Sequence, residues 1–465
     1  MKKKIFDVLL VGSGLSSIVF AKEYLKKNQN INIISPDFKK VTNQFPENQL
    51  SYKSLPPQFK KNYKKIDDYF YLNKLNFNKN NCSLLGSLEF GGLSNYWGLQ
   101  MDKSIDDDIK HLSKNTQKKL KDCFHEILNE NSLMGSYGKF NNNYKTDHYY
   151  ENFINKKKVG DTHIIEKPLI AISSSIKKFD KIGRNYSKLT PKDIIKNIDK
   201  KKIIFHNFYV DKITKEKNLI SVCCKNLNQE KTFITKKLIL AAGTLVTTKL
   251  LMDYFKVKET IPIKHHPRLI SVYFAKKKML SNLEMTPGLL QIKKNHRNKK
   301  YVGDLRPSNE TILNMASKTF SFLKPIKFIL LFFKDNILFS NNLLSSEFSN
   351  LYIKKNKDNF RIFSKNKNTL QILKDKQIKI FNFLKEKKII FSFYKNFFPG
   401  IGGDYHYFGS VQIKKKGKLS LNENCQLNHN KSIYVVDGSV FDFKKNLYPL
   451  GTIIANSKRI AKLIK

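Results

Sequence analysis

The first 37 residues contain an apolar run, an amphipathic segment and a second apolar run, in the order typical of a nucleotide-binding unit. Residues 5–11 are apolar except for Asp7, an amphipathic segment covers 15–27, and a second short, mostly apolar run covers 31–34. This pattern predicts a buried strand, a helix and a second buried strand. In the Gly-Ser-Gly turn after the first strand, Gly12 permits a sharp turn, and Gly14 lets the backbone approach a pyrophosphate at the helix N-terminus. The stretch therefore indicates half of a mononucleotide-binding unit.

Two positions depart from the G-x-G-x-x-G pattern and its usual acidic partner. Ser17 occupies the third glycine position, where a small residue suffices for close packing of helix on strand. Ser35 ends the second strand, where an acidic residue usually binds the ribose hydroxyls, and Asp37 is the candidate replacement. A glycine turn in some other α/β protein is the alternative interpretation.

Farther along the chain, extended and helical patterns alternate, which predicts an α/β protein. The Phe-rich stripe within residues 311–394 is expected to be core in preference to a lipid-binding face. The expected elements are a helix over 105–130, a short helix opening at 190–193, a strand over 202–213, a hairpin over 219–237, a strand, turn and helix over 237–255, Phe- and Leu-rich helical material over 311–394, a strand over 433–441 and a closing helix over 452–464.

The charge is extreme and changes the list of expected partners. The chain has 86 basic and 38 acidic residues, for a net charge of +48. Nearly all the basic residues are lysines, and they are spread along the whole chain together with asparagines. A general lysine and asparagine bias explains this distribution, so no specific nucleic-acid partner is expected. A lysine-rich surface attracted to anionic membranes is the functional alternative.

Cysteine usage and hydropathy favour a cytoplasmic protein, with association to a membrane surface left open. The five cysteines form no C-x-x-C pair, so neither a disulfide framework nor a metal site is expected. Asp7 and the glycine turn interrupt the apolar region after the basic start, which argues against a secretion signal. No run reaches the ~18–20 apolar residues of a membrane span.

Residues 83–102 form a second glycine-rich segment, in which glycines alternate with aromatic side chains. This pattern suits neither a plain helix nor a strand. Glycine-rich loops of this kind let backbone N–H groups lie against a large ligand.

Together, these segments resemble the glucose–methanol–choline family of FAD-dependent oxidoreductases, and especially its shorter bacterial members with GGLSNxWG loops. The resemblance runs through residues 7–35, 90–98, 210–251 and 403–464. It implies an α/β fold with a Rossmann-type FAD-binding domain and an interleaved α+β substrate-binding domain. The implied division is 1–104, 188–264 and 399–465 for the FAD-binding domain, 105–187 for a substrate or cap segment and 265–398 for the substrate-binding domain.

The resemblance also implies which residues hold FAD. Gly12, Gly14 and Ser17 match the pyrophosphate loop, and Gly91, Gly92, Ser94, Asn95, Trp97 and Gly98 match the loop along the flavin. Val210 matches the position that meets the adenine, and Ala242 and Gly243 match the strand end that closes over the dinucleotide. Asp437 and Gly438 match contacts to the pyrophosphate and ribityl chain. Thr452 and Ile453 begin a helix whose N-terminus would face the flavin and stabilise negative charge there.

The catalytic candidate is His406, which matches the H-x-x-G-[TS] element of the family. A neutral imidazole is suited to accept the proton of a substrate hydroxyl. The alternative is that His406 is a core or surface histidine without a catalytic role. The family's second catalytic position is His or Asn, and here it is Tyr448, with Asn446 two residues earlier. The pair His265-His266 resembles a His-Pro step at a strand start and is expected to be structural.

The leading hypothesis is an FAD-dependent enzyme that oxidises a CH–OH group of an alcohol or sugar by hydride transfer to flavin N5. The carbohydrate substrate rests on the resemblance, because short members of the family are tied to surface polysaccharide assembly. Two alternatives stay open: a flavin-dependent reductase or isomerase, which the altered Tyr448 position favours, and a non-catalytic flavoprotein fold at a membrane surface.

Overall fold

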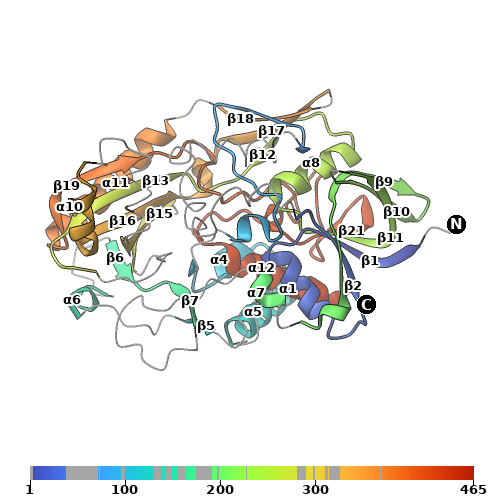
Figure 1. Ribbon diagram of the computed structural model, residues 1–465, viewed down its shortest axis with the longest axis horizontal. Coiled ribbons are helices and arrows are strands. Elements are labelled where there is room, and N and C mark those ends of the chain that lie inside the picture. Colours follow the sequence, from blue (N-terminus) through green and yellow to red (C-terminus); the bar gives the residue numbers. More distant parts are fainter. Residues whose placement is uncertain are drawn as a thin grey trace.

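The structure is a computed structural model, and the fold is mixed α/β, with helices packed on several sheets (Figure 1). The structure describes residues 4–37, 72, 74–95, 100–129, 138–141, 148–154, 163–173, 191–195, 198–226, 228–279, 290–296, 299–308, 313, 325–357, 359–365 and 368–464.

The largest sheet has a parallel centre. Its strands are β1 (Ile5–Val11), β2 (Ile31–Ile34), β8 (Ile203–His206), β9 (Tyr209–Glu216), β10 (Leu219–Lys225), β11 (Glu230–Leu240), β20 (Gln426–Leu427) and β21 (Asn430–Val435). The order is β20-β21-β11-β1-β2-β8, and all neighbours from β21 to β8 pair in parallel. β9 and β10 continue from β11 as antiparallel neighbours.

Helices cover both faces of this first sheet, as the continuous burial of β2 and of the second half of β1 requires. They are α1 (Leu15–Tyr24), α5 (Lys114–Asn129), α7 (Pro191–Ile195), α8 (Thr244–Tyr254) and α12 (Leu450–Leu463). α12 packs between α1 and α5, and α7 packs against α1. These four helices lie on one side of the sheet and α8 on the other (Figure 1).

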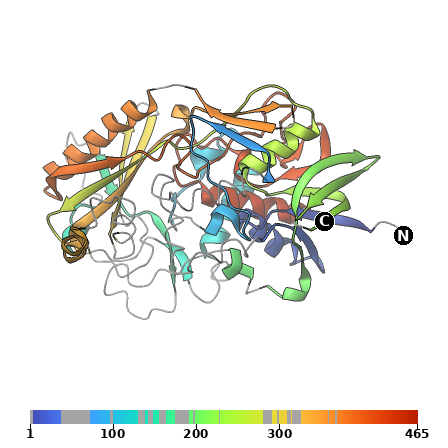
Figure 2. The same ribbon diagram turned by 45° about the horizontal axis from the view of Figure 1, so that its top comes forward.

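A second, six-stranded sheet lies at the other end of the molecule and is antiparallel throughout (Figure 2). Its strands, in spatial order, are β19 (Ile390–Phe397), β13 (Arg268–Ala275), β16 (Ile337–Leu344), β15 (Lys299–Pro307), β14 (Leu290–His296) and β6 (His163–Glu166). The long helix α11 (Thr369–Glu386) packs against β13, β15, β16 and β19.

Smaller elements connect the two ends. One sheet has the order β12 (Ile261–Ile263), β17 (Leu351–Asn356), β18 (Asn359–Ser364) and β3 (Phe77–Asn80), and another has the order β4 (Gln100–Met101), β7 (Leu169–Ser173) and β5 (Gly138–Asn141). The short helices are α4 (Asp106–Ile109), α6 (His148–Glu151), α10 (Lys327–Phe332) and the 3-10 turns η4 (Gly92–Asn95), η7 (Lys200–Lys202), η9 (Lys334–Asn336), η10 (Ser346–Phe348) and η11 (Gly438–Val440).

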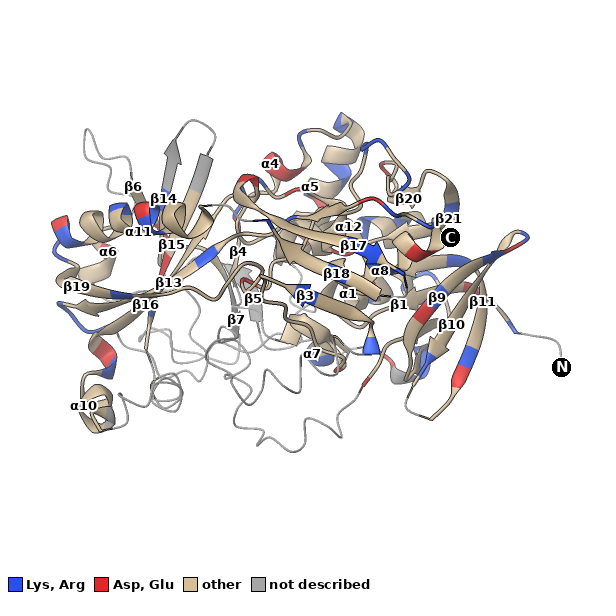
Figure 3. Cartoon of the chain, turned by 90° about the horizontal axis from the view of Figure 1, so that it is seen from above, with Lys and Arg blue, Asp and Glu red and all other residues tan. Residues whose placement is uncertain are grey.

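The α/β class and the opening strand–helix–strand unit are confirmed. β1 and β2 occupy the predicted ranges, α1 starts at Leu15 as predicted, and the closing helix is present as α12. Basic residues lie on elements at both ends of the molecule instead of forming one stripe (Figure 3). None of the helices in the described part of the chain is both long and apolar enough to cross a membrane.

Three predictions of secondary structure are wrong. The single strand over 202–213 is two strands, because β8 pairs with β2 while β9 turns away to pair with β10. The predicted hairpin strand and the strand after it are one long strand, β11. The expected helical region over 311–394 contains the strands β16 to β18 and most of β19, because pairing with β13 and β12 outweighs local helical propensity.

Candidate functional site

A cavity of about 250 Å³ lies at the carboxyl ends of β1, β2 and β11. The carboxyl edge of a parallel sheet is where α/β proteins place their ligands. Eleven residues that were predicted to bind a cofactor line this one cavity: Gly12, Gly14, Gly91, Gly92, Ser94, Val210, Ala242, Gly243, Asp437, Gly438 and Ile453. The structure therefore gathers segments that are hundreds of residues apart around a single space.

The lining of the cavity comes from several elements. Ser35 and Pro36 after β2 lie with Val210 of β9 in the lining, and so do the first glycine turn and the first residues of α1. Leu450 and Ile453, at the start of α12, also line it. Two helix N-termini, those of α1 and α12, thus reach one continuous space.

The first glycine turn is fixed by contacts that only glycine permits. Gly12 has a φ of +111°, and a Cβ there would lie 2.2 Å from the carbonyl oxygen of Ala241. The turn is closed by the Ser17 hydroxyl, which donates to the Gly12 carbonyl oxygen at 2.6 Å. Ser17 therefore shapes the turn from behind and is not among the described lining residues.

Ser35, where an acid was expected, joins the two glycine loops through Ser13. The Ser13 and Ser35 hydroxyl oxygens share a hydrogen bond of 2.6 Å. Ser13 Oγ also accepts from the backbone N–H of Gly91, at 2.8 Å. The hydroxyl pair thus links the first turn, β2 and the second glycine loop.

The N-terminus of α1 has no cap from its own N-cap residue, Gly14. Instead, Leu15 N–H donates to the Ser94 hydroxyl of the second loop, at 3.0 Å. No acidic side chain lies in the first turn of α1. The helix dipole and its N–H groups therefore favour an anion beside Gly14 and Ser94.

Two predicted cofactor residues support the second loop instead of lining the cavity. Asn95 Nδ2 donates to the Phe90 carbonyl at 2.8 Å, and Asp37 Oδ1 accepts from Phe90 N–H at 3.5 Å. The N–H of Asp37 in turn donates to Asn207 between β8 and β9. Trp97 and Gly98, also predicted, lie outside the described residues.

Asp437 is a buried carboxylate whose hydrogen bonds hold together the opposite wall of the cavity. Its Oδ2 accepts from Gly243 N–H and from the Thr247 hydroxyl, and its Oδ1 accepts from Ser439 N–H and Oγ. Burial raises the pKa of Asp437 despite these hydrogen bonds. Beside it, Gly243 has a φ of +84°, and a Cβ there would meet no atom within 4 Å.

His406 is not among the described residues that line the cavity, but its neighbours Tyr405 and Tyr407 both line it. The structure brings it to the buried pair before β13: His406 Nδ1 lies 3.3 Å from Nδ1 of His266. Asp404 Oδ1 accepts from the His406 N–H, and Asp404 Oδ2 lies 2.6 Å from His265 Nδ1. The His265-His266 pair, expected to be structural, thus holds the His406 segment from the side of the second sheet.

The hydrogen bonds define the tautomer of His406. His266 Nε2 lies 2.8 Å from the Phe443 carbonyl oxygen, which can only accept, so Nε2 carries the proton. In a neutral ring, His266 Nδ1 must then accept, and His406 Nδ1 must donate to it. The Nε2 atom of His406 is left with its lone pair. This is the tautomer that a general base requires.

Both rings are held neutral. Burial, followed by the proximity of His266, lowers the pKa of His406 to about 3. Burial lowers the pKa of His266 to about 4. Burial would raise the pKa of Asp404, but His265 and His406 beside it bring that pKa below its usual range.

The other two catalytic candidates are engaged elsewhere. The Tyr448 hydroxyl donates to Asp304 of β15 at 3.2 Å, and burial raises its pKa well above the usual value. Asn446 Nδ2 donates to the Ser104 carbonyl and to Asp108. Asn446 therefore anchors α4.

Thr452 anchors α4 as well, because its hydroxyl donates to Asp108 Oδ2 at 2.5 Å. Burial raises the pKa of Asp108 to about 8. Thr452 was predicted to face the cofactor, but among the described residues the α12 start lines the cavity through Leu450 and Ile453 instead.

A polar face of the second sheet lies over Tyr448. Gln291 of β14 stands directly opposite Asp304 of β15, so both side chains share one face. Gln291 is fully buried, and neither its Oε1 nor its Nε2 has a hydrogen-bond partner among the described residues. A buried amide without partners is unusual, because most buried polar side-chain atoms form a hydrogen bond.

Sequence reasoning missed several of these contributors. Ser13, Tyr405 and Tyr407 flank residues that were singled out, but nothing in a local pattern distinguished them. Tyr405 has a φ of +69°, which is unusual for a non-glycine residue and places strain beside His406. Among the described residues, no group of three or more His, Cys, Asp or Glu side chains is arranged to hold a metal ion.

Comparison with known proteins adds no relative: no protein-family model and no curated protein matches this chain.

Proposed function

We propose that the protein is an FAD-dependent oxidoreductase that oxidises a CH–OH group of an alcohol or sugar, as its resemblance to the glucose–methanol–choline family implies. The observation that carries the proposal is the relay from the Phe443 carbonyl through His266 to His406, which leaves His406 Nε2 as a proton acceptor beside a nucleotide-type cavity.

The residues of the cavity suit FAD. The α1 N-terminus with Gly14 and Ser94 favours the pyrophosphate, and Gly243, where a Cβ would meet only open space, leaves room for a close approach. The α12 N-terminus favours negative charge on the flavin end. Bound there, FAD would supply the acceptor for the substrate hydride.

In the proposed reaction, the residues of the chain itself accept the substrate proton and orient the group that accepts it. His406 Nε2 takes the hydroxyl proton while the hydride leaves the carbinol carbon, and His266 fixes the orientation of the His406 ring. Tyr448 stays protonated and donates its hydroxyl hydrogen bond to Asp304. The unpaired Gln291 amide beside them suits a substrate with several hydroxyl groups.

The test is an absorption spectrum of the purified full-length protein, followed by anaerobic mixing with alcohols and sugars. We expect bound flavin and its reduction by one substrate class. In His406→Ala, flavin should stay bound while the reduction rate falls roughly 10²- to 10⁴-fold. The matched control is His429→Ala, which removes an exposed histidine. A wild-type protein without flavin contradicts the cofactor, and unchanged reduction in His406→Ala contradicts the base.

A further inference from the structure

The second sheet lies at the end of the molecule opposite the chain termini (Figure 1). This end carries a concentrated group of exposed aromatic side chains. Seven of the twelve exposed large hydrophobic side chains among the described residues belong to residues 326–333 and to β19. Phe328 is 82% exposed, Phe332 77% and Phe393 62%. We call this surface the aromatic patch; its members are Ile326, Phe328, Ile329, Phe332, Phe333, Phe391 and Phe393.

The patch exists because α11 covers only one face of the sheet. Tyr273 and Tyr394 turn toward α11, where Tyr273 stacks on Phe381 and Tyr394 contacts it with a tilted ring. On the other face, Phe274 contacts Phe333, Phe391 and Phe393, with ring centroids 5.8, 5.8 and 6.0 Å away. These contacts join Phe333 of the α10 end to Phe391 and Phe393 of β19. The prediction that the Phe-rich stripe is core is wrong for Phe328 and Phe332.

The chain segments that border the patch are basic. The turn after β13, the start of η9 and the turn before β19 contribute Lys276, Lys277, Lys278, Lys334, Lys387 and Lys388. The same segments contribute two acidic residues, Asp335 and Glu386. Backbone hydrogen bonds from Lys276 to Ile389 and from Met279 to Asp335 hold these segments together. Lys276 Nζ lies 5.7 Å from the centroid of the Phe391 ring, so the basic rim touches the aromatic patch.

We propose that the aromatic patch docks the protein on the surface of an anionic lipid bilayer. Exposed Phe and Ile side chains would enter the boundary between headgroups and acyl chains, while the lysine rim contacts lipid phosphates. The apolar centre suits the acyl chains of an anionic bilayer, and the basic rim suits its headgroups. A second copy of the chain is a poorer occupant, because a two-fold pairing would bring two basic rims together.

This docking is independent of the redox proposal, since the patch lies on the second sheet and the cavity at the carboxyl edge of the first. The net charge alone suggested an attraction to anionic membranes, and the docking proposal places that attraction at the aromatic patch. A protein held by this end would keep the first sheet away from the lipid (Figure 1).

The test is co-sedimentation of the full-length protein with vesicles of phosphatidylcholine alone or mixed with phosphatidylglycerol. We expect binding to the mixed vesicles that weakens with added salt. The double variant Phe328→Ser/Phe332→Ser should bind about tenfold or more weakly, because the two most exposed rings of the patch are gone. Lys276→Glu/Lys277→Glu/Lys278→Glu should lose both binding and its salt dependence.

Matched controls separate the patch from general hydrophobicity and charge. Ile378→Ser removes an exposed apolar side chain from α11, on the covered side of the same sheet. Lys215→Glu/Lys217→Glu reverses exposed charges near the β9–β10 turn of the first sheet. Both should bind like the wild type. Equal binding of the Phe328→Ser/Phe332→Ser variant overturns the proposal, as does a wild type that ignores the mixed vesicles. A variant that changes only the oligomeric state points to a second copy and overturns it too.

Discussion

The two large sheets of this protein bury their strands in different ways, and each supports a different kind of surface. In the first sheet, helices cover both faces, so β2 is buried along its whole length, and the cavity lies at the strand ends. In the second sheet, α11 covers one face, and the other presents side chains such as Phe393 to solvent. The first arrangement makes a cavity of backbone groups, whereas the second makes a docking face.

The largest contrast to be measured, about a hundredfold in rate, concerns the point where the two regions meet, at His406 and His266. Because the pKa of His406 is about 3, the proposed base stays unprotonated, and the rate of substrate-dependent flavin reduction should not fall between pH 7 and pH 4.5. A histidine with an ordinary pKa near 6.5 would lose about a hundredfold at pH 4.5.

The His266→Gln variant sharpens this test. Since His266 lowers the pKa of His406, its removal should move the acidic limb of the rate profile to higher pH. Stopped-flow measurement of flavin reduction at a series of pH values gives the rate profile of the wild type and of the variant. If the rate of the wild type fell with a midpoint near pH 6.5, burial and His266 would not lower the pKa of His406.

The next effect tests the first glycine turn. Gly12→Ala should lower the free energy of unfolding by about 1–3 kcal/mol more than a matched glycine substitution, because its Cβ would overlap the Ala241 carbonyl. The control is Gly417→Ala, which has the same φ of +111° but no atom within 4 Å of the new Cβ. Urea unfolding compares them, and equal losses would mean that backbone strain alone explains the glycine.

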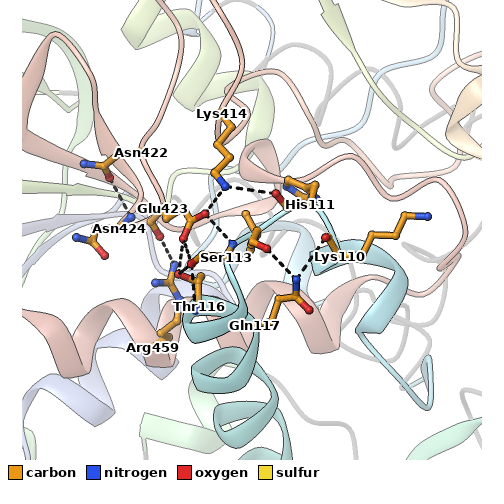
Figure 4. A network of polar contacts seen from close by, with 11 residues as sticks. Lys110, His111, Ser113, Thr116, Gln117, Lys414, Asn422, Glu423, Asn424 and Arg459 are labelled. Carbon is orange, nitrogen blue, oxygen red and sulfur yellow. Dashed lines mark hydrogen bonds and ion pairs between the residues drawn. The ribbon is translucent and has the colours of Figure 1, made fainter.

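Glu423 tests how the first region holds its outer helix α5. Its carboxylate accepts from Ser113 N–H and Oγ and from the Thr116 hydroxyl, and it pairs with Lys414 (Figure 4). Burial opposes ionisation, but these partners lower the pKa of Glu423 to about 2. Glu423→Gln should therefore cost about 1–2 kcal/mol at pH 7.

The pH dependence of that cost has a definite sign. A depressed carboxylate pKa stabilises the folded state above the unfolded value near 4.5, and the stabilisation is lost as pH falls toward 2. The difference in unfolding free energy between wild type and Glu423→Gln should thus shrink across that window. Glu216→Gln, at an exposed position of β9, is the control and should change little.

A smaller effect is expected for a glycine in the second sheet. The Cβ of Gly303→Ala would lie 2.8 Å from Cδ1 of Ile380 on α11, a flexible side-chain tip that can move. The loss should be about 1 kcal/mol, less than for Gly12→Ala. A loss as large as that of Gly12→Ala, measured by urea unfolding, would show that the second sheet is as tightly constrained as the first.

The smallest effect is expected on the aromatic patch. Phe328→Ser/Phe332→Ser should change the unfolding free energy by less than about 0.5 kcal/mol, because both rings are already exposed. Thermal unfolding without vesicles measures this. A large destabilisation would place these side chains in a core and remove the contrast between the two sheets.

The sequence by itself determined the local parts of this protein. The apolar runs of β1 and β2, the turn at Gly12 and the start of α1 follow from periodicity and glycine chemistry within a few residues. The same holds for the glycine loop at Gly91. These signals are local, so they could be read without knowing any long-range partner.

Only the tertiary structure decided which side chains meet. His266 approaches His406, Tyr448 binds Asp304, and Asp37 and Asn95 support a loop instead of lining the cavity. The same folding left Phe328 in solvent. The physical reason is that burial, tautomer and pKa depend on groups brought together from distant positions, and on which face of a sheet another helix happens to cover.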